Sequence, residues 1–252
     1  MTKIIMCGCC GAMGRLITEL AENDADIEIV AGVDVRPSRE LKYPIFESVT
    51  DCDIEADVVV DFSRPDALAD ILNYCEERAI AAVLCTTGYT DEQVNDIEEA
   101  AKRVPILRSA NMSLGINVLL KLLKDATKIF GGEGFDIEIV EKHHNKKVDA
   151  PSGTALALAD AVNEAAGDAY HYVYDRSDKH EMRDSKEIGI SAVRGGTIVG
   201  DHDVIFAGSD EVITFSHRAY SKAVFGKGAL AAAKFMAGKP AGRYDMSDVI
   251  NG

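Results

Sequence analysis

Short apolar runs alternate with amphipathic segments through the first half of the chain. The runs contain almost no polar alternation, and the segments between them have apolar residues spaced as on one face of a helix. Continuous apolar strands that alternate with helices are typical of a parallel sheet covered by helices on both faces. The first half therefore predicts an α/β, Rossmann-type doubly wound fold. The expected strands lie at residues 3–8, 27–34, 56–63, 81–88 and 105–110, and the expected helices at 15–23, 67–79 and 91–103.

The pattern changes in the second half of the chain. Residues 114–130 have the spacing of a long amphipathic helix, and residues 135–144 alternate apolar and charged positions as a half-exposed strand does. Residues 154–166, rich in Ala and Leu, predict another helix. Three later segments are separated by short turns of Gly, Asp and Ser, and this succession of segments and turns predicts antiparallel strands. These segments lie at 190–200, 203–208 and 211–219.

The segment at 222–238 is alanine-rich and predicts a helix like those expected in the first half of the chain. We therefore expect two domains. Residues 1–112 and 225–252 are expected to form the doubly wound domain. Residues 113–224 are expected to form an inserted α+β domain with a mixed or antiparallel sheet.

The charge of the chain narrows the choice of partners. Its 252 residues include 42 acidic and 27 basic side chains, which gives a formal net charge of −15. Such a balance argues against nucleic acid or an anionic membrane surface as partner. No apolar run is long enough to span a bilayer, and the N-terminal residues lack the pattern of an export signal. We expect a cytoplasmic protein.

All six cysteines lie in the first third of the chain. A chain of this size needs no disulfide scaffold, so reduced thiols are expected. Three of them, Cys7, Cys9 and Cys10, are close enough in sequence to suggest zinc. However, a strand that runs into a turn is expected to splay them, and no further Cys or His pair completes a usual ligand spacing. We expect no metal site.

A glycine-rich turn joins the first expected strand to the first expected helix. Gly11 and Gly14 fill two places of the dinucleotide fingerprint G-x-G-x-x-G, whereas Cys9 stands in the first. Gly11 would let the backbone approach a pyrophosphate, and Gly14 would let the helix pack close to the strand. Asp34 lies twenty residues beyond Gly14 at the end of the second strand, where an acidic residue accepts hydrogen bonds from a ribose. A turn that merely connects strand and helix is the simpler alternative, and Asp34 argues against it.

The type of dinucleotide stays open. Asp34 favours a free ribose 2′-hydroxyl, as in NADH, whereas Arg36 could meet a 2′-phosphate, as in NADPH. Loops at the carboxyl ends of the other parallel strands also face the ligand crevice of such a fold. The expected cofactor contacts are Gly8, Cys9, Cys10, Gly11, Ala12, Met13, Asp34, Arg36, Cys85, Thr86, Thr87, Ser109, Ala110, Asn111 and Met112.

Residues 141–158, EKHHNKKVDAPSGTALAL, gather cations directly before a helix start. His143, His144, Lys146 and Lys147 leave the end of a strand, and the free backbone N–H groups of the following helix start can receive an anion. The stretch is therefore suited to a small dianionic substrate, with His or Lys available to give a proton. Surface lysines and a simple helix cap are the alternative for each residue alone. Metal binding by the adjacent histidines is unfavourable from an extended strand.

The run EIVEKHHNKKVDAPSGTA at 138–155 resembles the signature of the 4-hydroxy-tetrahydrodipicolinate reductase (dihydrodipicolinate reductase) family. The resemblance extends over essentially the whole chain, through GCCGAMG, CTTG, SANMS, SAVRGGTIVGDHDVIFAG and EVITFSHRAYSKAVFGKGA. Two positions depart from the family pattern, since Cys85 replaces a usual glycine and Ala12 a frequent arginine. The signature residues present are Glu138, Glu141, His143, Lys147, Asp149, Pro151, Ser152, Gly153, Thr154 and Ala155.

The resemblance implies hydride transfer from NADH or NADPH to a cyclic dicarboxylate in diaminopimelate and lysine biosynthesis. It implies that His143 donates or accepts a proton and that Lys147 donates one. His144, Gly153 and Thr154 would hold the substrate. It also implies a homotetramer assembled through the sheet of the second domain, which would then serve both substrate binding and tetramerisation, while the first domain binds the dinucleotide.

Two other functions share part of this pattern. A dehydrogenase of an amino or imino acid such as aspartate would carry the glycine turn and Asp34, but it has no need of HHNKKVDAPSGT. A nucleotide-sensing module would bind dinucleotide and gain thermal stability without turnover. The presence of both His143 and Lys147 argues against the sensing module.

Overall fold

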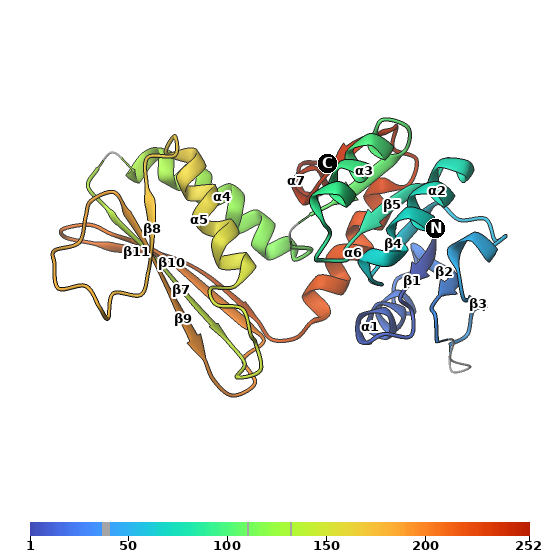
Figure 1. Ribbon diagram of the computed structural model, residues 1–252, viewed down its shortest axis with the longest axis horizontal. Helices are drawn as coiled ribbons and strands as arrows, with labels where there is room; N and C mark the ends of the chain where they lie inside the picture. Colours follow the sequence, from blue (N-terminus) through green and yellow to red (C-terminus); the bar gives the residue numbers. More distant parts are fainter. Residues whose placement is uncertain (37–40, 110, 132) are drawn as a thin grey trace. The chain divides into compact units, whose positions relative to one another are not determined.

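The computed structural model describes residues 1–36, 41–109, 111–131 and 133–252. The chain divides into two compact units (Figure 1). Unit 1 consists of Met1–Leu114 and Ala223–Gly252, and unit 2 of Gly115–Lys222. Among the described residues, no helix is both long and apolar enough to cross a membrane.

Unit 1 is built on a parallel sheet of seven strands in the order β12-β6-β5-β4-β1-β2-β3. The chain passes from β1 to β2 and β3 on one side, and β4 then returns to the other side of β1. This reversal creates a crevice between the carboxyl ends of β1 and β4, where doubly wound folds bind ligands. The strands are β1 (Thr2–Cys7), β2 (Ile27–Val33), β3 (Ile45–Phe46), β4 (Val58–Asp61), β5 (Ala81–Leu84), β6 (Pro105–Arg108) and β12 (Gly242–Tyr244).

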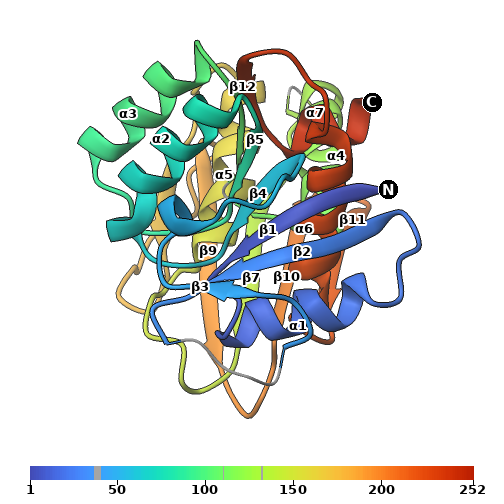
Figure 2. The same ribbon diagram turned by 90° about the vertical axis from the view of Figure 1, so that its right-hand side faces the viewer.

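Helices cover both faces of this sheet (Figure 2). Alternate residues of each strand point to opposite faces, so Ile4 and Met6 pack with α1, α6 and α7, whereas Ile5 and Cys7 pack with α2 and α3. Both faces are apolar, which is why the strands read as continuous apolar runs. The helices are α1 (Ala12–Ala21), α2 (Leu68–Arg78), α3 (Asp91–Ala101), α6 (Ala223–Met236) and α7 (Met246–Asn251), with short 3-10 turns at Val49–Asp51 and Pro65–Ala67.

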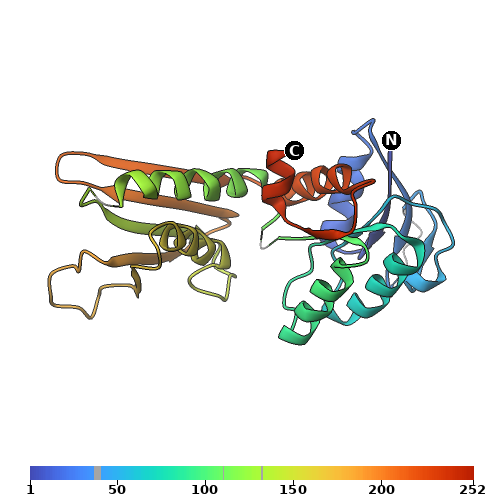
Figure 3. The ribbon, with the colours of Figure 1, turned by 90° about the horizontal axis from the view of Figure 1, so that it is seen from above.

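Unit 2 is a five-stranded sheet with two helices packed on one face (Figures 1 and 3). Alternation along β7 places Ile137 and Ile139 against the helices, together with Val204 and Phe206 of β10. The strands lie in the order β11-β10-β7-β9-β8. The elements are α4 (Leu114–Phe130), β7 (Asp136–His143), α5 (Gly153–Ala165), β8 (His171–Tyr174), β9 (Glu187–Arg194), β10 (Gly200–Ala207) and β11 (Val212–Ala219).

The architecture confirms the expected fold class, a doubly wound parallel sheet and an inserted domain with a mixed sheet. One expectation within unit 2 is wrong. The strand expected at 190–200 is β9, which begins and ends earlier and pairs in parallel with both β7 and β8 rather than antiparallel. The other two expected segments, β10 and β11, do pair antiparallel with each other, and β10 also pairs antiparallel with β7.

Candidate active site

The glycine turn after β1 has the close approach that its spacing predicts. Gly8 has a φ of +78°, and a Cβ there would lie 2.5 Å from the carbonyl oxygen of Phe62 at the end of β4. A Cβ on Gly14 would lie 2.3 Å from the carbonyl oxygen of Gly8, so α1 packs directly on the turn. Both positions exclude any side chain, and Gly11, which also has none, is the N-cap residue of α1.

Asp34, just beyond β2, is held in place by two backbone donors. The amide of Cys10 donates to Oδ2 at 2.9 Å, and the amide of Arg36 donates to Oδ1 at 3.0 Å. The carboxylate is therefore fixed beside the glycine turn, with lone pairs left to accept hydrogen bonds from a ligand.

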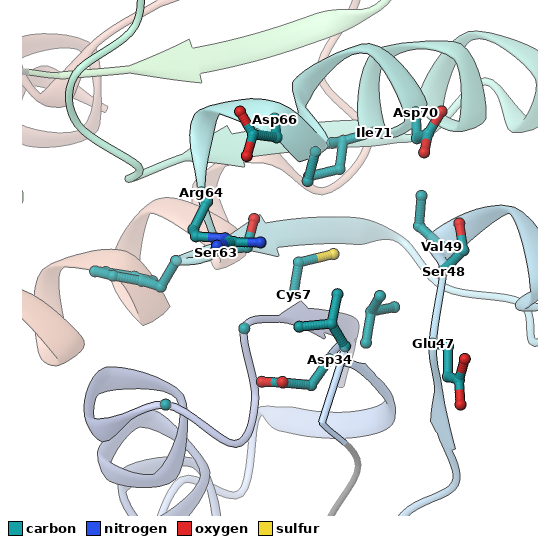
Figure 4. A pocket seen from close by; sticks show the side chains of 16 residues that line it. Cys7, Asp34, Glu47, Ser48, Val49, Ser63, Arg64, Asp66, Asp70 and Ile71 are labelled. Atoms are coloured by element: carbon teal, nitrogen blue, oxygen red, sulfur yellow. The ribbon is translucent and has the colours of Figure 1, made fainter.

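A cavity of about 410 Å³ opens at the carboxyl ends of β1, β2 and β4. Figure 4 shows Asp34 on one side, Arg64 and Asp66 on another, and Glu47 and Ser48 on a third. Its size and its mixture of apolar walls with a few polar groups are typical of a small-molecule site. The lining residues are Cys7, Gly8, Gly11, Val33, Asp34, Val35, Glu47, Ser48, Val49, Phe62, Ser63, Arg64, Asp66, Ala67, Asp70 and Ile71.

The cavity brings together only part of the expected cofactor residues. Gly8, Gly11 and Asp34 line it. Ala110 lies outside the described residues. The other expected contacts, which are absent from the lining, are Cys9, Cys10, Ala12, Met13, Arg36, Cys85, Thr86, Thr87, Ser109, Asn111 and Met112.

Sequence reasoning missed the segment Phe62–Ser63–Arg64, which forms one wall of the cavity. The sequence could have indicated this segment, because residues 62–64 directly follow β4. The loops at 85–88 and 109–113 were predicted as cofactor contacts for the same reason, since each follows a parallel strand. The fully buried carboxylate of Asp61 holds this segment, since Ser63 donates to it from both its amide and its hydroxyl. Tyr89 donates its hydroxyl to the same carboxylate at 3.2 Å, which ties the segment after β5 to the cavity wall.

The cysteines of the turn differ from expectation in one respect. The Sγ atoms of Cys9 and Cys10 lie 3.8 Å apart, so the turn does not splay this pair, and only Cys7 points to the opposite face of the sheet. Within the described ranges, Cys9, Cys10 and Asp34 are the one group of three or more His, Cys, Asp or Glu residues whose possible metal-ligand atoms all lie within 4.8 Å of one another. Burial raises the pKa of Cys9 to about 12, and Cys10 adds to this shift. The buried Cys9 thiol is therefore protonated near neutral pH, as an inert packed thiol is.

In unit 2, the end of β7 places a histidine and a carboxylate on the same face of the sheet. Glu141 and His143 have the parity of Ile137 and Ile139, so they point to the side covered by α4 and α5. Glu141 is fully buried, and its Oε2 lies 2.6 Å from His143 Nδ1. This contact leaves His143 Nε2 as the nitrogen that can act on a substrate.

Glu141 is the centre of a larger network. Arg194 at the end of β9 donates two hydrogen bonds of 2.7 Å to it, one to each carboxylate oxygen. The amide of Ser152 donates to Oε1 at 3.0 Å. Burial alone would raise the pKa of Glu141, but hydrogen bonds from Arg194, His143 and Ser152 together hold this pKa below its usual value. A charged Glu141 stabilises a protonated His143.

The other edge of the His143 ring faces Gly200, at the start of β10. A Cβ at Gly200 would lie 3.0 Å from His143 Nε2. Glycine therefore leaves His143 Nε2 uncrowded, and the sequence pattern gave no indication that Gly200 lies here.

The helix start expected to receive an anion is formed by α5. The Ser152 hydroxyl caps the helix by accepting the amide of Ala155 at 3.1 Å. The next residue, Gly153, has open space where a Cβ would be. Thr154 follows it in the first turn. The first N–H groups of α5 thus lie beside the His143 network, because Ser152 contacts Glu141 directly.

His144 and Lys147 lie in the turn after β7. The strand ends at His143, and the amide of Lys147 donates to the carbonyl of His144, so the strand parity of His143 and Lys147 does not extend into this turn. Lys147 Nζ pairs with Asp149 at 2.7 Å, and the pKa of Asp149 is held below its usual value by that hydrogen bond. His144 Nδ1 is buried and has no hydrogen-bond partner in the part of the chain that the structure describes.

Comparison with known proteins decides the family. The model for the dihydrodipicolinate reductase N-terminus matches residues 2–112, and the model for the C-terminus of the same family matches residues 115–250. The chain belongs to the dihydrodipicolinate reductase family. Together the two models span nearly the whole chain, so both units are part of the family fold.

Curated relatives of this dihydrodipicolinate reductase family member are close in sequence. The 4-hydroxy-tetrahydrodipicolinate reductase of Clostridium tetani is 53% identical over 100% of this chain and 98% of its own length. That of Caldanaerobacter subterraneus subsp. tengcongensis is 52% identical over 99% of this chain and 98% of its own length. A dipicolinate-bound dihydrodipicolinate reductase from Paenisporosarcina sp. TG-14 has the same fold, with a TM-score of 0.83 at 23% identity and coverage of 99% of both chains.

The family resemblance drawn from the sequence is thus confirmed. As a dihydrodipicolinate reductase, this chain is an oxidoreductase of diaminopimelate and lysine biosynthesis, and reductases of this family use a nicotinamide cofactor.

Proposed function

We propose that this enzyme reduces 4-hydroxy-tetrahydrodipicolinate to tetrahydrodipicolinate with NADH or NADPH. The 4-hydroxyl leaves with a hydrogen of the neighbouring ring carbon as water, one hydride and one proton enter the ring, and the dinucleotide is oxidised. The nicotinamide supplies the hydride when it is bound. The protein residues hold the two carboxylates of the substrate, orient the ring and supply the proton.

The dinucleotide is proposed to bind to unit 1. The cavity beside Gly8 and Gly11 has room for an adenosine, and the missing side chains of these two glycines would let a pyrophosphate approach the first N–H groups of α1. Asp34 would accept hydrogen bonds from the ribose hydroxyls. The other expected cofactor residues remain part of this proposal, with Arg36 near a 2′-phosphate and the loops after β5 and β6 as further contacts of the dinucleotide.

The substrate is proposed to bind to unit 2. The N–H groups at the start of α5, with Gly153 and Thr154, would receive one carboxylate, and His144 would contact the substrate beside them. Lys147 would form an ion pair with the dianion in place of Asp149. Lys147 and Nε2 of His143 would share the delivery of the one proton that the ring gains, while Glu141 stabilises the charged ring of His143.

One observation favours this proposal over the alternative functions. Glu141 contacts both the ring of His143 and the amide of Ser152 at the start of α5. A proton donor and an anion-receiving helix end are therefore joined by one buried carboxylate, as reduction of a dicarboxylate requires.

Turnover tests the function directly. Purified protein should oxidise NADH or NADPH, seen as loss of nicotinamide absorbance, when it meets 4-hydroxy-tetrahydrodipicolinate freshly made by its synthase. Without that substrate, the absorbance should stay constant. Protein that binds dinucleotide but oxidises neither form would contradict the proposed reaction and favour a nucleotide-sensing role.

The choice between NADH and NADPH should depend on Asp34. We expect Asp34→Asn to raise the Kd of NADH about ten-fold, because a charged acceptor of the ribose hydroxyls is lost. The Kd of NADPH should change less, since a carboxylate repels the 2′-phosphate. Fluorescence titration with each dinucleotide measures both values. Asp96→Asn is the matched control, because Asp96 is exposed on α3 and does not line the cavity. Equal effects on NADH and NADPH would contradict the ribose assignment.

The enzyme is further proposed to act as a homotetramer assembled through the sheet of unit 2. The face of this sheet opposite α4 and α5 carries apolar side chains at its surface. Val193 on β9 and Val212 on β11 are 45% and 62% exposed. Burial of such side chains against a second copy would favour assembly.

A further inference from the structure

His202 lies beside the proposed substrate site, yet the proposed chemistry gives it no role. It sits on β10 with the parity of Val204 and Phe206, so it points toward the helices of unit 2. Its side chain is deeply buried, with 4% of the residue exposed. A buried polar ring of this kind needs a hydrogen-bond partner to offset its desolvation.

That partner is the helix cap of α5. His202 Nε2 lies 3.0 Å from the hydroxyl of Ser152. The same ring contacts His143 edge to face, with 5.2 Å between ring centroids and 75° between ring planes. His202 thus touches both the anion-receiving helix start and the proposed proton donor.

These contacts close a circuit of four side chains. Glu141 binds the His143 ring through one carboxylate oxygen and the Ser152 amide through the other. The Ser152 hydroxyl continues to His202, and the His202 ring returns to His143. Each member is held by two neighbours, so none can turn without breaking a contact.

We propose that His202 is a positioning residue, which fixes the start of α5 and the ring of His143 in the geometry that binds a dicarboxylate next to its proton donor. This inference rests on the proposed function. The active form of His202 is neutral, because Nδ1 has no partner among the described residues and a charged ring would leave a buried N–H unpaired there.

The surroundings of His202 keep it neutral. Burial above all, and then the neighbouring His143, lower the pKa of His202 to about 4, although Glu141 acts in the opposite direction. His217, opposite His202 on β11, and Lys147 also disfavour a second positive charge. His202 therefore serves as a fixed hydrogen-bond partner near neutral pH rather than as a proton donor.

Two substitutions separate the hydrogen bond from packing. His202→Leu removes the bond to Ser152 but fills the space, whereas His202→Gln keeps a neutral polar group at the position of Nε2. Calorimetric titration with dipicolinate should give a Kd raised about ten-fold in His202→Leu, and the value should return to within about three-fold of wild type in His202→Gln. The KM of the substrate should follow the same order.

Two controls accompany this titration. The Kd of NADH should be unchanged in both variants, because the proposed dinucleotide site belongs to unit 1. His171→Leu, an exposed histidine on β8, should bind dipicolinate as wild type does.

The outcomes are distinct. Wild-type affinity for dipicolinate in His202→Leu would overturn the role of His202 and leave the proposed function intact. Equal weakening in the Leu and Gln variants would also overturn it, because packing alone would then explain the effect. Wild-type protein that binds no dipicolinate would overturn the proposed substrate site and, with it, the role of His202.

Discussion

Replacing His143 with glutamine is expected to lower kcat by about 10²- to 10⁴-fold, the range that general acid catalysis contributes. The glutamine side chain can still meet Glu141, but it has no proton to donate near neutral pH. His143→Ala should lose as much turnover. KM should change far less than kcat, because the helix start and the turn that hold the carboxylates stay in place.

Lys147 is expected to show a comparable loss when replaced by alanine or glutamine, with a larger effect on KM because it also attracts the dianion. Steady-state kinetics at saturating dinucleotide separates kcat from KM. Lys146 provides the matched control, since it is an exposed lysine next to Lys147. Lys146→Gln should leave both constants within about two-fold. Unchanged kcat in both the His143 and Lys147 variants would refute the assignment of the proton donors.

Glu141→Ala is expected to lower the free energy of unfolding by about 3–5 kcal/mol, because it leaves the guanidinium of Arg194 without its buried partner. Denaturant titration followed by circular dichroism measures the loss. Glu141→Gln should lose less stability, since the amide keeps the shape of the side chain. Its kcat should still fall by at least ten-fold, because a neutral amide does not stabilise a protonated His143.

A double substitution separates stability from catalysis at this position. Replacing Glu141 by leucine and Arg194 by methionine removes both charges at once, and such a change is often neutral for stability. We expect the double variant to regain most of the free energy of unfolding that Glu141→Ala loses, while its kcat stays low. Recovery of kcat together with stability would show that Glu141 acts only through folding.

Sequence reasoning reached the fold class because the signals were local. Continuous apolar runs between helical spacings predict buried parallel strands wherever both faces of a sheet are covered. The missed elements of unit 1 are short, and β3, with only two residues, has too little periodicity to stand out. The prediction that β9 pairs antiparallel was wrong for a different reason. Alternation and short turns indicate a half-buried strand, but the pairing of that strand is a property of its neighbours.

Some residues of the candidate site could likewise be predicted from local sequence, and others could not. The cation cluster at His143 and Lys147 and the helix start at Ser152 are contiguous in sequence, so pattern and resemblance found them together. Arg194 and His202 are more than forty residues away from them. Nothing local to Arg194 or His202 indicates that either one faces Glu141 or Ser152.

Sequence alone was enough to predict most strands and helices, the glycine-containing turn before α1 and the cation-rich stretch before α5, because each depends on spacing over a few residues. The tertiary structure decided which distant groups meet. Because β7 lies between β9 and β10, Arg194 and His202 converge on Glu141 and on the cap of α5. Because β4 returns beside β1, the segment after β4 becomes a wall of the cavity at Asp34. Strand order is set by the burial of whole faces over the entire chain, and no short stretch of sequence contains it.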